Sequence, residues 1–509
     1  MIKTALISVS NKEGIVDFAK QLSKLGIKII STGNTAKLLK KNKVNVTLVS
    51  EITRFPEMLD GRLKSIHPNI FAGILADRKN KKHMQELKKL KIDTIDLVVI
   101  NFYPFEEAIK RNAKLKQAIE NIDIGGPSLA RATAKNHESI LVVVDAADYD
   151  LIIEKIKNKK LTNEDRVNLA AKAFAYTARY DAIISNYFNN LNKNEFPDIL
   201  NLTFKKIQNL RYGENPHQSS SFYRNVFVDE SCVANAKQLQ GKELSFNNIL
   251  DIDAAFELVK DFKQPAAAVI KHTNPCGVAS AETIEEAYRK AHQTDAMAAF
   301  GSIVALNRNC NAETSKLMKP LFIEAVICPK FEKAALGILK EKKNVRLLET
   351  GAIKKQKISY DLKRVKGGIL LQTDYYPEIS EKELKIVTKR KPAKEEMQAM
   401  LFAWKVNKHV KSNSIVLAKN NVTVGIGAGQ MSRVDAVKLA VMKSEGKSEG
   451  SVMSSDAFFP FRDGIDEAAK AGITAIIQPG GSIRDKEVIE AANQYKMAMV
   501  FTGVRLFRH

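Results

Sequence analysis

A lysine and a histidine stand side by side at Lys271 and His272, in the stretch IKHTNPCGVA at residues 270–279. The apolar run AAAVI precedes the pair and Asn-Pro-Cys-Gly follows it, so the pattern predicts a strand that ends in a turn. Both side chains exchange protons, and neither is a usual choice for packing beside an apolar strand. The pair is therefore a candidate for chemistry.

A second candidate lies near the N-terminus, where small hydroxyl residues and glycine follow two predicted strands. The stretches SVSNK and STGNTAK supply Ser8, Ser10, Lys12, Ser31, Thr32, Gly33, Asn34 and Thr35. Such turns meet at the carboxyl ends of parallel strands, and backbone N–H groups with hydroxyls and a lysine form a phosphate cradle. Simple N-capping by Ser and Thr is the alternative, and the Walker A spacing is absent.

Three further stretches add charged and aromatic groups to the same region. They are LDGRLKSIHP, INFYPF and IDIGGPSLARATAKNHES, and they supply Arg62, Lys64, Ser65, His67, Asn101, Tyr103, Asp123, Gly125, Gly126, Lys135, Asn136 and His137. A site that places Lys, Arg, Tyr and Asp around a phosphate could bind a nucleotide and move protons on its base.

The second half of the chain carries two more polar clusters. LRYGENPHQ and SDAFFPFRDGID contribute Arg211, Tyr212, Asn215, His217, Arg462 and Asp463. A catalytic zinc is not expected, because NPCG lacks the second cysteine of the P-C-x-x-C element and no H-x-E precedes it. GIGAG lacks the G-x-G-x-x-G spacing, so dinucleotide binding is weakly supported.

The elements that must position these groups alternate between strand and helix over the first 145 residues. Strands are predicted at 4–10, 27–31, 46–50, 94–105 and 139–145, with helices at 11–26 and 34–42. Their near-continuous apolar character predicts a parallel sheet that helices cover on both faces. Residues 148–190 read as helical, and the polar stretch 192–200 reads as a linker between domains 1–197 and 198–509. Residues 201–509 contain two stretches of similar plan, which suggests two related α/β subdomains.

Composition bounds the class of protein. The 509 residues include 45% hydrophobic and 27% charged residues, and no run approaches the roughly 20 apolar residues of a membrane helix. MIKTALISVSNKEG lacks a signal-peptide layout, so a cytoplasmic location is expected and the four cysteines are expected to be free thiols. The net charge of +23 attracts polyanions, although a lysine-rich composition alone explains it. The lysines are scattered without a reader motif, so nucleic-acid binding is not expected.

Together these motifs resemble one family, the bifunctional purine-biosynthesis enzymes that join aminoimidazole carboxamide ribonucleotide (AICAR) formyltransferase to IMP cyclohydrolase. The carrying stretches are SVSNK, GRLKSIHP, NFYPF, IDIGGPS, AKNH, LRYGENPHQ, KHTNPCG, SNSIV, GIGAGQMSR, SSDAFFPFRD and VRLF, in family order from residue 8 to 507. The resemblance implies an N-terminal methylglyoxal-synthase-like domain and a C-terminal formyltransferase domain of two deaminase-like α/β subdomains without zinc. It also implies a homodimer with transferase sites near its interface.

For the formyltransferase, the resemblance implies that a formyl group passes from the co-substrate 10-formyltetrahydrofolate to the 5-amino group of AICAR. His272 would be the general base, Lys271 would stabilise negative charge and help keep the imidazole neutral, and Asn413 would orient the reacting groups. Residues implied to bind nucleotide or folate are Arg211, Tyr212, Gly301, Glu324, Arg433, Asp463 and Arg505.

For the cyclohydrolase, the resemblance implies ring closure of formyl-AICAR to IMP with loss of water and no metal. Proton transfer and oxygen stabilisation would fall to Lys64, Tyr103, Asp123 and Lys135, without a decision on which is the acid. The nucleotide would be held by Ser10, Lys12, Thr32, Thr35, Arg62, Ser65, Asn101, Gly125 and Gly126. Thr32, Asn34 and Ser302 depart from the residues expected at their positions.

Two narrower functions compete with this interpretation. One half could serve only as a scaffold, or the first domain could have a regulatory role like that of methylglyoxal-synthase-like domains elsewhere. Proton-handling residues in both halves speak against the scaffold, and KHTNPCG in a long second domain speaks against the regulatory role.

Overall fold

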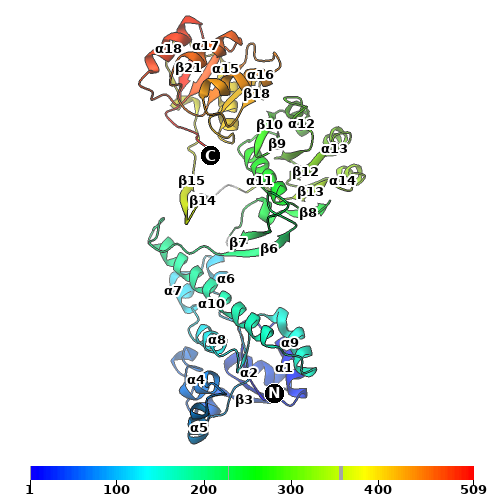
Figure 1. Cartoon of the computed structure of the whole chain (residues 1–509), viewed down its shortest axis with the longest axis vertical. Coiled ribbons are helices and arrows are strands. Elements are labelled where there is room, and N and C mark those ends of the chain that lie inside the picture. Colours follow the sequence, from blue (N-terminus) through cyan, green and yellow to red (C-terminus); the bar gives the residue numbers. More distant parts are fainter. Residues whose placement is uncertain (1, 227, 355–358) are drawn as a thin grey trace. The chain divides into compact units, whose positions relative to one another are not determined.

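The computed structural model describes residues 2–226, 228–354 and 359–509. The chain forms two compact units, Met1–Thr203 and Phe204–His509, which are described separately (Figure 1). The sequence suggested a boundary at residue 197, and we expect the two pieces to fold and act separately. Across the described residues, no helix combines the length and the apolar character needed to cross a membrane.

The first unit is built on a five-stranded sheet in which every neighbouring pair is parallel. Its order is β3-β2-β1-β4-β5, with bounds β1 Thr4–Ser8, β2 Lys28–Ser31, β3 Val46–Leu48, β4 Leu97–Ile100 and β5 Leu141–Val143. The order reverses direction at β1, whose neighbours are β2 and β4. In open parallel sheets this switch point is where ligands bind.

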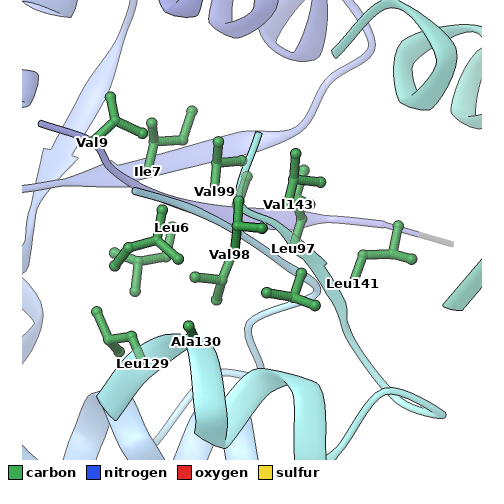
Figure 2. Packing of buried hydrophobic residues seen from close by; sticks show 14 of the residues in the cluster. Leu6, Ile7, Val9, Leu97, Val98, Val99, Leu129, Ala130, Leu141 and Val143 are labelled. Carbon is green, nitrogen blue, oxygen red and sulfur yellow. The ribbon is translucent and has the colours of Figure 1, made fainter. Parts of the chain in front are cut away.

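Helices accompany the sheet between and after its strands. They are α1 Ile15–Lys24, α2 Gly33–Lys41, α3 Val49–Thr53, α4 Pro68–Leu75, α5 Lys81–Leu90, α6 Phe105–Lys110, α7 Leu115–Glu120, α8 Gly125–Lys135, α9 Tyr149–Lys157 and α10 Asn163–Leu191. Figure 2 shows strand side chains on both sides of the sheet, with Leu129 and Ala130 of α8 beneath one face. Leu97, Val98 and Val99 are all fully buried, which explains their continuous apolar run.

All five strands predicted for the first unit extend beyond the strands that form, by one to eight residues. The strand expected at 94–105 is formed only at Leu97–Ile100, and α6 begins at Phe105. Pro104 has no backbone N–H and restricts the residue before it, so the ladder cannot continue through Tyr103. The strand expected at 46–50 ends at Leu48, because α3 begins at Val49.

The second unit contains a 12-stranded sheet that joins two halves of the same plan. Each half has an edge strand, a helix, a hairpin and three helix–strand pairs. The first half is β8 Lys237–Gln240, α11 Phe246–Lys260, β9 Ala266–Lys271, β10 Asn274–Ser280, α12 Ile284–His292, β11 Ser302–Leu306, α13 Ala312–Met318, β12 Ile323–Cys328, α14 Lys333–Leu339 and β13 Arg346–Glu349. The second half is β16 Lys385–Ile386, α15 Lys394–Asn407, β17 Ile415–Lys419, β18 Val422–Gly427, α16 Arg433–Lys443, β19 Val452–Ser455, α17 Asp463–Lys470, β20 Ala475–Gln478, α18 Asp485–Gln494 and β21 Ala498–Phe501.

The two halves meet where β10 pairs antiparallel with β18. The sheet order β16-β21-β20-β19-β17-β18-β10-β9-β11-β12-β13-β8 therefore reads the same way outward from this junction in both directions. The prediction of two related α/β subdomains is confirmed. Two small hairpins complete the described part of this unit, β6 Phe204–Leu210 with β7 Ser220–Asn225 and β14 Ser359–Val365 with β15 Gly368–Asp374.

Glycines let each hairpin lie directly against its following helix. A Cβ on Gly277 would lie 2.0 Å from the carbonyl oxygen of Ala291 in α12. In the second half, a Cβ on Gly427 would lie 2.0 Å from the carbonyl oxygen of Ala436 in α16. The first two glycines of the GIGAG stretch, Gly425 and Gly427, thus serve helix–sheet packing, which fits the lack of dinucleotide-binding spacing.

Candidate active sites

A cavity of about 470 Å³ lies at the carboxyl ends of β1, β2 and β4 in the first unit. Most residues predicted for this site line it, namely Ser10, Lys12, Thr32, Thr35, Arg62, Lys64, Ser65, Asn101, Tyr103, Asp123, Gly125 and Gly126. Strand ends separated by up to about ninety residues in sequence are brought together here, as the sheet topology requires.

Lys135 is the predicted residue that does not line this cavity. It is the exposed last residue of α8, whereas Gly125 and Gly126 at the start of the same helix line the cavity. Ten residues of helix rise about 15 Å, which sets the backbone of Lys135 well away from that of Gly125. Within one chain, the structure does not support direct participation of Lys135.

One end of the cavity is cationic and rich in backbone donors. The Lys12 ammonium donates to the Thr35 hydroxyl at 2.9 Å and to the carbonyl oxygen of Val9. Burial lowers the pKa of Lys12, and the nearby Lys64 ammonium lowers it further. A bound anion would oppose this lowering of the Lys12 pKa, because an opposite charge nearby favours the charged ammonium.

The N-terminus of α2 lies at the same end and already holds a carboxylate. Glu57 accepts from the backbone N–H of Gly33 at 3.1 Å and from the Thr32 hydroxyl. Sequence reasoning missed Glu57, because an exposed acidic residue in a loop gives no signal of its partner. Its position shows that these donors can bind an anionic oxygen.

Further residues of the same cavity combine a cation, a phenol and a carboxylate. The Lys64 ammonium lies 3.1 Å from the Tyr103 hydroxyl. Asp123 accepts from the backbone N–H of Gly126 at 2.8 Å and of Tyr103 at 3.3 Å. Burial raises the pKa of Asp123, although these two hydrogen bonds and the Lys64 charge oppose the rise. Three groups that can hold or move a proton therefore adjoin one another.

Local packing explains why these positions carry glycine, asparagine and acidic residues. A Cβ on Gly126 would lie 2.6 Å from the Asp123 carboxylate, so only glycine lets that carboxylate reach the start of α8. The Asn101 side chain accepts from the backbone N–H groups of Ser10 and Asn11, which joins the turns after β1 and β4. Arg62 is paired with Glu120, another cavity residue that sequence reasoning missed.

In the second unit, Lys271 and His272 line a cavity of about 230 Å³. They lie where β9 turns into β10, and the two turn residues His272 and Thr273 have φ angles of 52° and 60°. Two residues with positive φ between paired antiparallel strands form the tightest kind of hairpin turn. The turn leaves the His272 side chain exposed.

The Lys271 ammonium is held by the loop that precedes β11. It donates to the carbonyl oxygen of Phe300 at 2.9 Å, next to the predicted ligand residue Gly301. Gly301 has a φ of 72° and donates its N–H to the carbonyl oxygen of Phe322. Glu324 follows on β12, where it is paired with Arg346 at 2.6 Å. These predicted residues thus form a continuous group beside the turn.

Asn413 and Arg433 form a second group. The Arg433 guanidinium donates to the Asn413 side-chain oxygen at 2.8 Å and is paired with the buried Asp456. The Asn413 amide donates in turn to the carbonyl oxygens of Gln430 and Met431. Asn413 is therefore held in one orientation, and Arg433 is largely enclosed by protein.

The loops that carry Asn413 and His272 are linked. The Asn274 side chain, two residues after His272, accepts from the backbone N–H of Lys411 at 3.1 Å, two residues before Asn413. Of the residues predicted for this unit, Lys271 and His272 line the cavity, whereas Asn413, Gly301, Glu324, Arg433, Arg211, Tyr212, Asp463 and Arg505 do not. Arg211, Asp463 and Arg505 are exposed and Tyr212 is half-buried.

Comparison with known proteins decides the family. The family model described as "AICARFT/IMPCHase bienzyme" matches residues 133–443, and that described as "MGS-like domain" matches residues 14–128. The chain belongs to the AICARFT/IMPCHase bienzyme family. Three relatives named "Bifunctional purine biosynthesis protein PurH" match over the full length of both chains. They are 52% identical in Caldicellulosiruptor saccharolyticus, 53% in Thermoanaerobacter sp. and 51% in Bacillus cytotoxicus.

Membership of the family establishes the fold class and the two activities. The chain carries AICAR formyltransferase and IMP cyclohydrolase activities, the last two steps of IMP synthesis. The predictions of a methylglyoxal-synthase-like first domain and a formyltransferase second domain are confirmed.

Proposed function

We propose that formyl transfer from 10-formyltetrahydrofolate to AICAR takes place at the Lys271–His272 turn, and that formyl-AICAR closes to IMP in the first unit's cavity. The observation that carries the proposal is the exposed imidazole of His272 on a rigid turn, beside an ammonium group anchored on the Phe300 carbonyl. Incubation with AICAR and 10-formyltetrahydrofolate should yield IMP. If neither formyl-AICAR nor IMP forms, the proposal is contradicted.

In the transfer step, the 5-amino nitrogen of AICAR attacks the formyl carbon and forms a C–N bond. The carbonyl oxygen gains negative charge, which the Lys271 ammonium stabilises. His272 takes the proton that the amino nitrogen must lose, and the bond from the formyl carbon to the folate nitrogen then breaks. That nitrogen ends protonated as tetrahydrofolate leaves. Asn413, held by Arg433, orients the reacting groups.

In the cyclisation step, the carboxamide nitrogen attacks the formyl carbon and a C–N bond forms. The formyl oxygen becomes an oxyanion, is protonated and leaves as water, while the carboxamide nitrogen loses one of its two protons and the formamide nitrogen loses its single proton. Lys64, Tyr103 and Asp123 are the adjoining groups that can stabilise this oxygen and move these protons. The phosphate would bind at Lys12, Thr35 and the N-terminus of α2, in place of the Glu57 carboxylate.

The pH dependence of cyclisation tests the role of Asp123. Its carboxylate accepts protons only when ionised, so cyclisation is lost as pH falls through its pKa. Because burial raises that pKa above the usual 3.8, we expect the loss to begin at a higher pH than for an ordinary aspartate. The rate of cyclisation, measured between about pH 4 and pH 8, should therefore fall toward the acidic side, and this fall is the acidic limb of the pH profile. Asp123→Asn should abolish the limb, whereas Asp17→Asn in α1 should keep it. An unchanged limb in Asp123→Asn would contradict the assignment.

Separate fragments test whether each site is complete within its own unit. Residues 1–203 contain the whole five-stranded sheet, its core and every residue that lines the first cavity. We expect this fragment to cyclise formyl-AICAR and residues 204–509 to formylate AICAR. A first fragment that is folded by circular dichroism yet inactive would show that its site needs residues from beyond Thr203.

The remaining parts of the proposal are a homodimer and a cytoplasmic location, with no metal in the chemistry. A second chain beside the transferase site would supply the contacts that one chain leaves open at Arg211, Tyr212 and Arg505. Exposed apolar side chains on the hairpin β14–β15, such as Leu362 and Leu370, support an interface between copies. Sedimentation of the intact protein should give twice the chain mass.

A further inference from the structure

The turn that carries His272 also contains Thr273, a residue that disfavours the backbone conformation of the turn. His272 and Thr273 have φ angles of 52° and 60°, in the left-handed region that favours glycine and asparagine. Thr273 is β-branched, which makes this region especially unfavourable for it. Something outside the turn must therefore hold it in place.

The matching turn in the other half of the sheet carries residues that tolerate this backbone conformation. There β17 and β18 are joined by Asn420 and Asn421, with φ angles of 49° and 57°. Asparagine tolerates this region because its short side chain can bond locally to the backbone. The same turn geometry thus occurs twice in this chain, once with favourable residues and once with a histidine and a threonine.

The Asp251 carboxylate supplies hydrogen bonds that hold the His272–Thr273 turn. One oxygen of its carboxylate accepts from the backbone N–H of Thr273 at 2.7 Å, and the other accepts from that of His272 at 3.2 Å. Asp251 lies near the middle of α11, which is capped by Ser245 and Asn248 and buries Ile252 and Phe256 completely. Its position is therefore fixed by the core rather than by the turn.

We infer that Asp251 is a positioning residue for formyl transfer, because its carboxylate holds the His272–Thr273 backbone in the conformation that presents the imidazole. The inference rests on the proposed role of His272 as the general base. Asp251 bonds to the backbone of the turn and has no part in proton transfer. Its removal should therefore affect the reacting geometry more than the binding of AICAR.

Asp251→Ala removes both acceptors and keeps a good helix-forming residue in α11. We expect kcat for formyl transfer to fall about tenfold to a hundredfold, the range that a base displaced by about 1 Å produces. KM for AICAR should change less than about threefold, because the ligand contacts remain. Asp253→Ala, two residues along the same helix, is the matched control. Circular dichroism and thermal unfolding of each variant report whether the second unit, which contains both positions, is folded.

A second substitution separates positioning from a merely structural effect. Thr273→Gly should restore most of the lost kcat in Asp251→Ala, because glycine adopts positive φ without help. A general weakening of α11 would not be rescued in this way. Equal activity of Asp251→Ala and the double variant would overturn the inference, as would wild-type kcat in Asp251→Ala.

His272→Ala measured in parallel distinguishes failure of the Asp251 positioning role from failure of the proposed general base. If His272→Ala loses transfer while Asp251→Ala keeps it, the general base stands and the positioning role of Asp251 is wrong. If His272→Ala itself transfers formyl groups normally, the proposed function of the turn is wrong.

Discussion

His272→Ala should lower kcat for formyl transfer by about 10²- to 10⁴-fold, the usual contribution of a general base. The 5-amino nitrogen of AICAR must lose a proton as it attacks, and His272 is the imidazole that the turn between β9 and β10 exposes beside Lys271. Formation of formyl-AICAR from AICAR and 10-formyltetrahydrofolate measures the loss. Cyclisation of supplied formyl-AICAR should stay intact, because its cavity lies in the other unit.

The matched control for this experiment is His292→Ala, at the end of α12 in the same half of the sheet. His292 does not line the cavity with Lys271, so its removal should leave transfer within about twofold of the wild type. Added imidazole should restore part of the activity of His272→Ala and none in the control, since it replaces the missing base. Near-normal transfer by His272→Ala would contradict the assignment.

The gathering of the cyclohydrolase residues could be predicted because a parallel sheet imposes it. Apolar runs reveal the strands, and the carboxyl ends of parallel strands meet at one edge. Ser10, Thr32 and Asn101 therefore had to lie close together, and all three line the cavity. The repeated plan of the second unit was visible for a similar reason, since each half carries the same succession of elements.

Residues that act on a distant stretch of backbone could not be predicted. Asp251 and Glu57 appear in the sequence as ordinary acidic residues of a helix and a loop, and their partners lie about twenty residues away. Only the packing of α11 against β9 and the folding of the loop after α3 bring them to their targets. Lys135 differs from the other residues predicted for the cyclohydrolase, because it is the last residue of α8 and does not line the cavity of a single chain.

Lys64→Met should lower kcat for cyclisation by about 10²- to 10³-fold, comparable to loss of one oxyanion donor in a preorganised site. Lys64 is 3.1 Å from the Tyr103 hydroxyl, and its charge acts on both Lys12 and Asp123. Its removal leaves the oxygen that becomes water without this cation. KM should change less, because loss of the Lys64 charge raises the pKa of Lys12 and keeps that ammonium charged for the phosphate.

The same substitution has a second consequence that a loss of folding would not produce. Because the Lys64 charge lowers the pKa of Asp123, Lys64→Met should raise that pKa and move the acidic limb of cyclisation to higher pH. Lys116→Met in α7 is the matched control, since Lys116 is exposed and lies outside the cavity lining. Formyl transfer measures the intact second unit in each variant. Cyclisation at the normal rate would contradict the role of Lys64 at the reacting oxygen. A lower rate with an acidic limb that stays in place would contradict its effect on Asp123.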